Sequence, residues 1–186
     1  MNNKLVCEQR LDIIKKLFIY FLLYSVFGWC YEVFLEVVIY QWGFTNRGVL
    51  FGPYCPVYGV GALMFIICFY KFVKKPYTGI MKYLKPVLVF LLCMLAATLL
   101  ELLTSYILEF LTGSWPWQTY ADYKINFQAR IALSPSLRFG LGGLLFLYIL
   151  QPIFEKLTAK LTPKALNIIT IILAIIFITD LMITIL

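Results

Sequence analysis

Apolar residues follow one another in five long runs, and short polar segments separate these runs. A helix needs at least roughly 17 mostly apolar residues to cross about 30 Å of hydrocarbon, and each run is that long. The pattern therefore predicts an all-α protein, an integral membrane bundle of five transmembrane helices. We expect these helices at residues 17–40, 56–72, 86–112, 136–154 and 165–185.

The composition supports this interpretation and limits what else the chain can contain. Of its 186 residues, 62% are hydrophobic and 13% are charged, and the mean hydropathy is +0.88. Soluble domains average about 45–50% apolar and about 25% charged residues. We therefore expect one transmembrane domain over residues 17–186 and no sizeable soluble domain.

The basic residues predict an orientation for the helices. Twelve of the sixteen lysines and arginines fall before the first run, between the second and third, or between the fourth and fifth. Because basic residues accumulate on the cytoplasmic side, we expect a cytoplasmic segment at residues 1–16, the N-terminus inside and the C-terminus outside. The net charge of +7 then reflects topology, and we expect no nucleic-acid partner.

The two outer connections, residues 41–55 and 113–135, are rich in aromatic and turn-forming residues. Pro53 and Pro56 prevent a continuous helix in the first of them. Backbone without helical hydrogen bonds is tolerated at membrane depth only inside protein or beside water. We therefore expect these loops to be partly re-entrant, with residues 48–56 lining a cavity. Glycines in the following helices are expected to allow close helix contact: Gly59, Gly61, Gly140, Gly142 and Gly143.

The chain also carries a weak internal repeat. The segment from Arg47 and the segment from Arg130 each continue through a leucine, a proline and an aromatic-Gly-x-Gly step into an apolar run. The repeating unit would be helix, outer loop, helix, so the first two helices would correspond to the third and fourth in a parallel repeat. A pocket would then form where the two halves meet.

Four glutamates interrupt the first and third apolar runs, and arginines lie on the same outer side. An acid at the centre of a membrane helix costs about 2.5–3.5 kcal/mol on insertion scales, so it usually has a partner. We expect Glu32 or Glu36 to pair with one arginine and Glu101 with the other, while Glu109 lies close to the surface. These pairs would either lock helices together or form a polar site for a solute or lipid head group.

We predict an outward-facing site whose acids bind cationic groups and whose arginines bind anionic groups. Its binding residues are predicted to be Glu32, Arg47, Glu101, Asn126 and Arg130. Residues in support are Asn46, Glu36, Pro53, Tyr58, Trp117 and Tyr123. The chain has no histidine and no CxxC pair, so we expect no metal, no cofactor and no catalytic residue, and we interpret the five cysteines as small buried hydrophobic residues.

Two segments, YSVFGWCYE (24–32) and TNRGVLFGPYCPVYGVGAL (45–63), resemble the Putative ABC-transporter type IV family, also called CmpB-like. This family comprises small bacterial multi-pass membrane proteins. In the second half, residues at the positions of the family pattern are Glu101, Asn126, Arg130, Ile131, Ser136, Leu137 and Gly140. The family's Trp-Asp-Tyr-Ser element is absent, however, and Ala129 and Phe139 replace a glycine and a tryptophan of the pattern.

The resemblance implies a permease-like transport component in the cell membrane, in contact with the lipid bilayer. The chain has no Walker A pattern, so an ATPase would be a separate subunit, and five spans also favour a homo-oligomer. One alternative is a non-catalytic assembly partner or sensor. A second is a membrane-embedded enzyme acting on lipid or cell-envelope substrates, with Cys55 as a candidate nucleophile.

Overall fold

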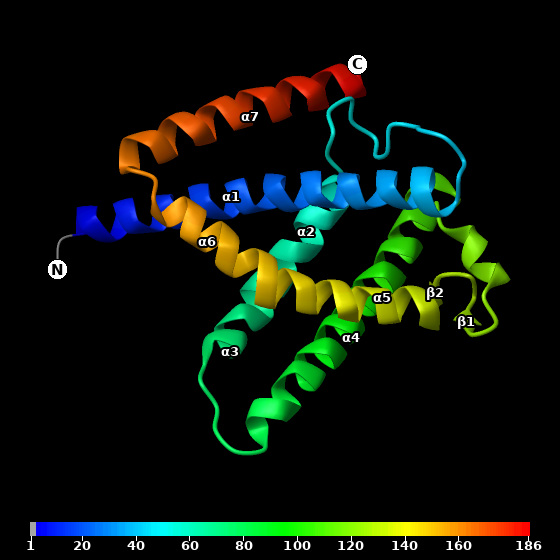
Figure 1. The fold of residues 1–186 in the computed structure, drawn as a ribbon. Helices are drawn as coiled ribbons and strands as arrows, with labels where there is room; N and C mark the ends of the chain where they lie inside the picture. The colour runs from blue at the N-terminus through cyan, green and yellow to red at the C-terminus, as the bar shows by residue number, and fades with distance from the viewer. Residues whose placement is uncertain (1–2) are drawn as a thin grey trace. The chain divides into compact units, whose positions relative to one another are not determined.

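The computed structural model describes residues 3–186, with side chains from Glu8 onward, and the described chain is helical along most of its length (Figure 1). Five of the described helices are long and apolar enough to cross a membrane, which confirms the predicted class. They cover Glu8–Ile39, Pro56–Lys74, Met81–Thr112, Leu133–Ala159 and Pro163–Ile185.

The first two spans are continuous helices that change pitch near one end. Helix α1 (Asn3–Phe34) continues as a π-helical turn at Leu35–Ile39. Helix α2 (Pro56–Phe65) continues through a π-helical turn at Ile66–Tyr70 into α3 (Lys71–Lys74). The first helix therefore begins well before residue 17, because the polar N-terminal residues extend the helix beyond the apolar run.

The third, fourth and fifth spans are α4 (Met81–Thr112), α5 (Leu133–Leu144) continued by a π-helical segment (Leu145–Leu150) and α6 (Gln151–Ala159), and α7 (Pro163–Ile185). The last helix starts with a cap, since the Thr162 hydroxyl accepts a hydrogen bond from the Ala165 N–H and proline occupies the first turn. The third ends at Gly113, whose φ of 79° allows a left-handed C-cap.

The chain forms two compact units. The first unit comprises the N-terminal stretch up to Met64 together with Ile153–Leu186, and the second comprises Phe65–Pro152. The second and fourth spans thus each contribute one end to each unit.

In the first unit, α1 and α7 run side by side in the same direction (Figure 1). The Phe177 ring of α7 meets Phe21 edge-on at a centroid distance of 5.5 Å. Tyr20 of α1 hydrogen-bonds Thr158 of α6 at 2.8 Å, and the Tyr24 ring packs on Phe154 at 5.1 Å. These contacts fix α1 against both helices of the C-terminal part.

In the second unit, α5 packs on α4. Thr98 of α4 and Ser136 of α5 are joined by a hydrogen bond of 2.8 Å. A short hairpin precedes α5, in which β1 (Asn126–Phe127) pairs antiparallel with β2 (Ile131–Ala132). Its turn uses Gln128 and Ala129, whose φ angles are both positive.

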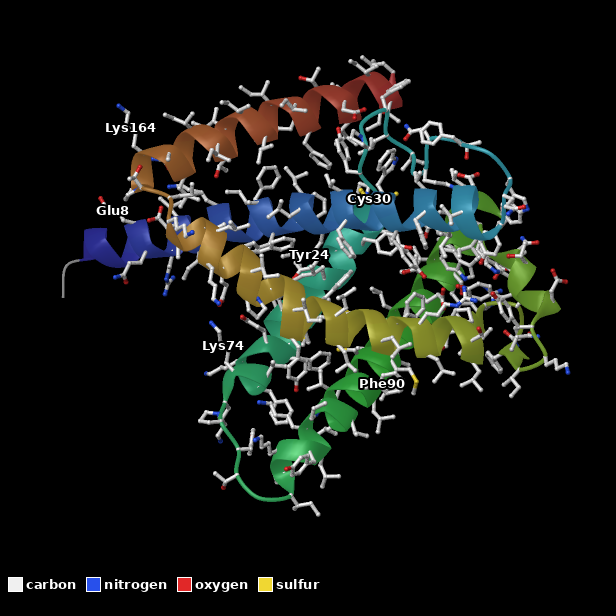
Figure 2. All side chains as sticks on the ribbon, viewed as in Figure 1. Glu8, Tyr24, Cys30, Lys74, Phe90 and Lys164 are labelled. Carbon is white, nitrogen blue, oxygen red and sulfur yellow. The ribbon has the colours of Figure 1, made fainter. Side chains whose placement is uncertain are left out.

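Apolar side chains are exposed along most of α7, which begins next to the labelled Lys164 (Figure 2). A contiguous apolar surface of this length in a chain of such composition faces lipid rather than water.

The cysteines differ in their exposure. Cys55 and Cys93 are buried as expected, whereas Cys30 and Cys68 are exposed on apolar helices, and the side chain of Cys7 lies outside the described residues.

The five glycines that were predicted to allow close helix contact differ in the space around them. A Cβ built on Gly59 would lie 2.5 Å from the Phe21 carbonyl oxygen, and one on Gly140 would lie 2.6 Å from the Phe90 ring. At Gly143 it would meet the Cys93 sulfur, so these three glycines allow close approach as predicted. The prediction was wrong for Gly61 and Gly142, where a Cβ would meet no atom within 4 Å.

Gly59→Ala should destabilise the first unit by about 1–3 kcal/mol because the added methyl overlaps the α1 backbone. Gly61→Ala is the matched control and should be neutral or slightly stabilising, since alanine favours a helix over glycine by about 0.5–1 kcal/mol. The readout is the temperature at which half of the detergent-solubilised protein is lost from its size-exclusion peak. Equal midpoints for the two variants would contradict the packing described.

Candidate functional site

A cavity of about 310 Å³ lies in the first unit. The end of α1, the connection between residues 40 and 55, and the start of α2 together form its wall. The residues that line it are Glu32, Arg47, Gly48, Val49, Cys55, Pro56, Val57 and Tyr58. Three predicted residues, Glu32, Arg47 and Tyr58, therefore share one cavity.

The local sequence explains why the chain turns back at this place. Pro56 begins α2 and ends the non-helical connection. The Cys55 N–H donates a hydrogen bond to the Ser25 carbonyl at 2.9 Å. At a rise of 1.5 Å per residue, Ser25 lies about 20 Å along the helix axis before the end of the first span. Gly48 has a φ of +98°, which favours glycine. The connection thus returns alongside α1 as far as Ser25, and its re-entrant position in a membrane stays a prediction.

Gly28 makes room for the tyrosine that reaches the acid in the cavity wall. A Cβ on Gly28 would overlap the Tyr58 ring, so only glycine allows this ring to lie against α1. From that position the Tyr58 hydroxyl donates a hydrogen bond to Glu32. The tyrosine therefore supplies a neutral donor to Glu32.

The second acid of α1 has a charged partner. Arg47 Nη2 lies 2.8 Å from Glu36 Oε1, and the Thr45 hydroxyl donates to the same oxygen at 2.7 Å. Glu36 is buried, so its charge is compensated within the protein. The prediction that Glu32 or Glu36 pairs with an arginine is confirmed for Glu36.

Two supporting residues hold the connection itself. The Asn46 side chain accepts a hydrogen bond from Trp29 Nε1 at 2.8 Å and donates to the carbonyls of Leu50 and Phe51. Pro53 lies in the same connection but does not line the cavity. Both residues shape the wall rather than face the space inside it.

Asp180 of α7 is a polar residue that the sequence analysis missed. Its carboxylate accepts hydrogen bonds from the backbone N–H groups of Phe51 at 3.0 Å and Gly52 at 2.7 Å, and from the Tyr54 hydroxyl. Burial, with Asp180 beside it, raises the pKa of Tyr54 above its usual range, so this hydroxyl stays a donor. A lone acid in an otherwise apolar span is the signal that could have identified it.

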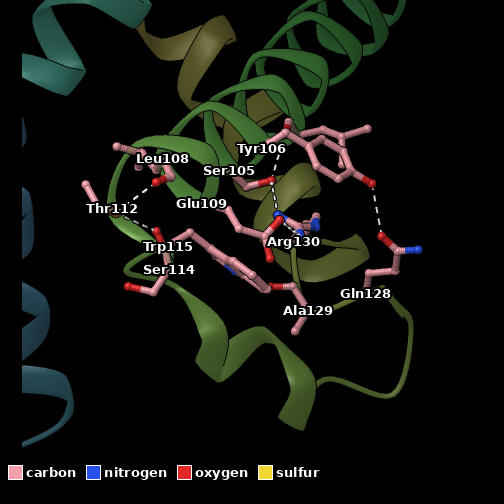
Figure 3. Close-up of polar contacts among 11 residues, drawn as sticks. Ser105, Tyr106, Leu108, Glu109, Thr112, Ser114, Trp115, Gln128, Ala129 and Arg130 are labelled. Carbon is pink, nitrogen blue, oxygen red and sulfur yellow. Dashed lines mark hydrogen bonds and ion pairs between the residues drawn. The ribbon is translucent and has the colours of Figure 1, made fainter.

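The second unit holds its arginine in a closed cage (Figure 3). Arg130 Nη2 lies 2.5 Å from Glu109, and Nη1 donates to Ser105 at 3.4 Å. The guanidinium carbon lies 4.1 Å from the Tyr106 ring centroid and 4.0 Å from that of Trp115. Arg130 is only 6% exposed. The predicted pairing of the second arginine with Glu101 was therefore wrong, because Glu109 near the helix end meets the hairpin from which Arg130 projects.

Glu101 has a neutral partner instead. The Tyr120 hydroxyl, from the 3₁₀ helix at Gln118–Asp122, donates to Glu101 at 2.8 Å. Burial, and then the charge of Glu101, raise the pKa of Tyr120 above its usual range, which keeps its proton on the hydroxyl. The second carboxylate oxygen of Glu101 is buried without a hydrogen-bond partner.

The remaining predicted residues of this unit hold together the connection between α4 and α5. Asn126 bonds the Tyr123 carbonyl at 2.7 Å and accepts from the Ala129 N–H at 3.2 Å. Trp117 donates from its indole to the Arg130 carbonyl at 2.9 Å, and the Tyr123 ring packs edge-on against Tyr120. That these residues share one binding site with Glu32 and Arg47 stays a prediction, because they belong to different units.

The sequence matches the Putative ABC-transporter type IV family over residues 19–185. The chain belongs to this family. No match was found among curated proteins or among solved structures. The family description, together with the five spans, makes this an ABC-transporter-type multi-pass membrane protein.

The thiol in the cavity wall belongs to Cys55, which is buried. Burial, followed by the charge of Glu32, raises the pKa of Cys55, whereas a nucleophilic cysteine needs a lowered pKa. In the part of the chain that the structure describes, no three His, Cys, Asp or Glu side chains gather to hold a metal ion.

Asp180→Asn should loosen the connection that forms the cavity wall, because the variant removes the charge that accepts three hydrogen bonds. Hydrogen bonds to charged groups contribute about 1.5–3 kcal/mol each, so local opening should become at least about tenfold more frequent. The measurement is the rate at which a maleimide labels Cys55 after Cys7, Cys30, Cys68 and Cys93 are replaced by alanine.

The matched control for this experiment is Asp12→Asn, which changes an acid of α1 whose recorded contact is an ion pair with Lys15. It should leave the labelling rate of Cys55 within about twofold. An Asp180→Asn variant that labels no faster than this control would show that α7 does not hold the connection.

Arg130→Lys should destabilise the second unit by about 1–3 kcal/mol, because lysine cannot stack flat between two rings while it binds a carboxylate. The control, Lys124→Gln, removes a charge from an exposed position of the same connection and should change the stability by less than about 0.5 kcal/mol. Thermal unfolding followed by tryptophan fluorescence measures both. An Arg130→Lys midpoint equal to that of the control would mean that the cage contributes nothing.

Proposed function

We propose that this protein is the membrane component of a transport system and that it binds its solute in the cavity of the first unit. The observation that carries the proposal is the cavity wall itself, in which Glu32 and Arg47 face a space of about 310 Å³. Ionisable side chains in membrane spans usually mark a substrate or ion pathway. The family description adds independent support for transport.

The break in the chain before α2 suits this role. Transporters form midplane sites where helices are interrupted, because the freed backbone then lines a cavity. Here the non-helical connection that ends at Pro56 contributes Gly48 and Cys55 to the wall. With the orientation predicted from the basic residues, the connection and its cavity open toward the outside of the cell.

The energy for transport would come from another protein. The sequence has no P-loop pattern, so we propose a separate ATPase subunit as partner. We assign no catalytic step to this chain, since the raised pKa of Cys55 is the opposite of what a nucleophile requires. A homo-oligomer would supply the additional spans that a complete permease needs.

The test compares the solutes of cells that lack the gene with those of cells that express it. Deletion should change the ratio of at least one solute between cells and medium severalfold, and the wild-type chain should restore this ratio. Glu32→Gln should not restore it, because the variant removes the charge from the cavity wall. Mass spectrometry of cell extracts and spent medium measures the ratios.

Glu8→Gln is the matched control, because it neutralises an exposed acid of the same helix and should restore the ratio fully. Variant protein levels in the membrane must be equal. If deletion changes no solute and the purified chain carries one stoichiometric membrane partner instead, the protein is an assembly or sensor component and the transport proposal fails.

A further inference from the structure

The charges of the cavity wall do not cancel one another. Glu32 and Arg47 are the charged side chains that line the cavity among the described residues. Arg47 is already paired with Glu36 at 2.8 Å, whereas the partner of Glu32 within the described part of the chain is the neutral hydroxyl of Tyr58. These three ionised groups together give the site one net negative charge.

The ion pair presents only part of its polar atoms to the cavity, which Arg47 lines with a side chain that is 36% exposed. Arg47 Nε and Glu36 Oε2 lack hydrogen-bond partners, but both atoms are shielded from solvent. A solute inside the cavity therefore meets the carboxylate of Glu32 and a guanidinium whose charge is compensated by Glu36. The sequence predicts that Arg47 binds an anionic group of the solute. The ion pair with Glu36 gives Arg47 a different role.

The rest of the wall suits a cation with apolar substituents. Val49, Pro56 and Val57 present hydrocarbon, and Tyr58 contributes an aromatic ring beside the carboxylate. Aromatic rings attract ammonium groups, more strongly where water is excluded. An anion would meet a guanidinium whose charge Glu36 already compensates, and a strongly hydrated small ion would meet a wall that is mostly hydrocarbon.

We propose that the cavity binds a monovalent organic cation, an alkylated ammonium group with a small apolar body, with Glu32 as its counter-ion. The inference rests on the proposed function in that it names the solute class for the same cavity. Glu36 and Arg47 act as a neutral pair that holds the connection in place.

The sign of the charge can be measured without knowing the solute. In a chain whose native cysteines are replaced by alanine, Val49→Cys places a thiol in the cavity wall. Its reaction rates with two methanethiosulfonate reagents, one carrying trimethylammonium and one carrying sulfonate, are each divided by the rates for a free thiol in solution. The wild-type wall should favour the cationic reagent, and Glu32→Gln should lower this preference about tenfold, as expected for one charge at close range near a surface.

The double variant Glu36→Gln/Arg47→Gln distinguishes cation binding by Glu32 from anion binding by Arg47. It removes both charges of the neutral pair and leaves the single charge of Glu32, so the preference for the cationic reagent should persist. If the site instead recognises an anion through Arg47, wild type will favour the sulfonate reagent and the double variant will lose that preference. That result, or no effect of Glu32→Gln, would overturn the proposal.

Occupancy is then tested with three probes of similar size: tetramethylammonium, pivalate and glycine betaine. Tetramethylammonium should protect the thiol at position 49 from labelling and should lose this effect in Glu32→Gln. Protection by pivalate or betaine alone, or by none of the three, would overturn the assignment to a cation. These labelling rates do not depend on transport. If the cavity prefers anions while the solute ratios still depend on the protein, this inference is wrong and the proposed function stays in place.

Discussion

An ionised side chain inside a membrane span requires a partner, and this requirement organises the connection after the first span and the connection after the third. Each connection returns toward the helix that carries the acids and supplies the groups that compensate them. The partners in the first unit are one arginine, two tyrosines and the backbone of the connection, and those in the second unit are one arginine and one tyrosine. The acids that they compensate are Glu32, Glu36, Glu101, Glu109 and Asp180.

Much of this was predictable, and the failures have physical reasons. Hydrophobic runs identified the five spans because lipid tolerates little else. The requirement for a cation near the acids identified Arg47 and Arg130, but the choice of partner went wrong in the second unit because only cations were considered. A tyrosine hydroxyl can donate to a buried carboxylate without carrying a charge, and Tyr120 does so to one oxygen of Glu101. Sequence spacing gives no sign of such a donor, since it comes from a 3₁₀ helix within a connection.

Both units compensate their acids with arginine and tyrosine side chains, but they differ in whether an acid faces a cavity. In each unit an arginine from the connection pairs with the acid nearer the helix end, and a tyrosine hydroxyl bonds the other acid. Arg130 is covered on both faces by aromatic rings, so its unit presents a closed structural cage. Glu32 instead faces a cavity. The internal repeat stays a prediction, yet the comparison shows that similar residues can either stabilise a connection or line a space.

The fifth helix, which has no counterpart in the predicted repeat, completes the first unit. The connection that bounds the cavity is attached at one end to the Ser25 carbonyl of α1 and in its middle to Asp180 of α7. Because α7 also packs along α1 through Phe177, the carboxylate is held at a fixed position and the connection has little freedom to move. The shape of the cavity therefore depends on a residue that does not touch it, and sequence similarity between the two halves could not have identified that residue.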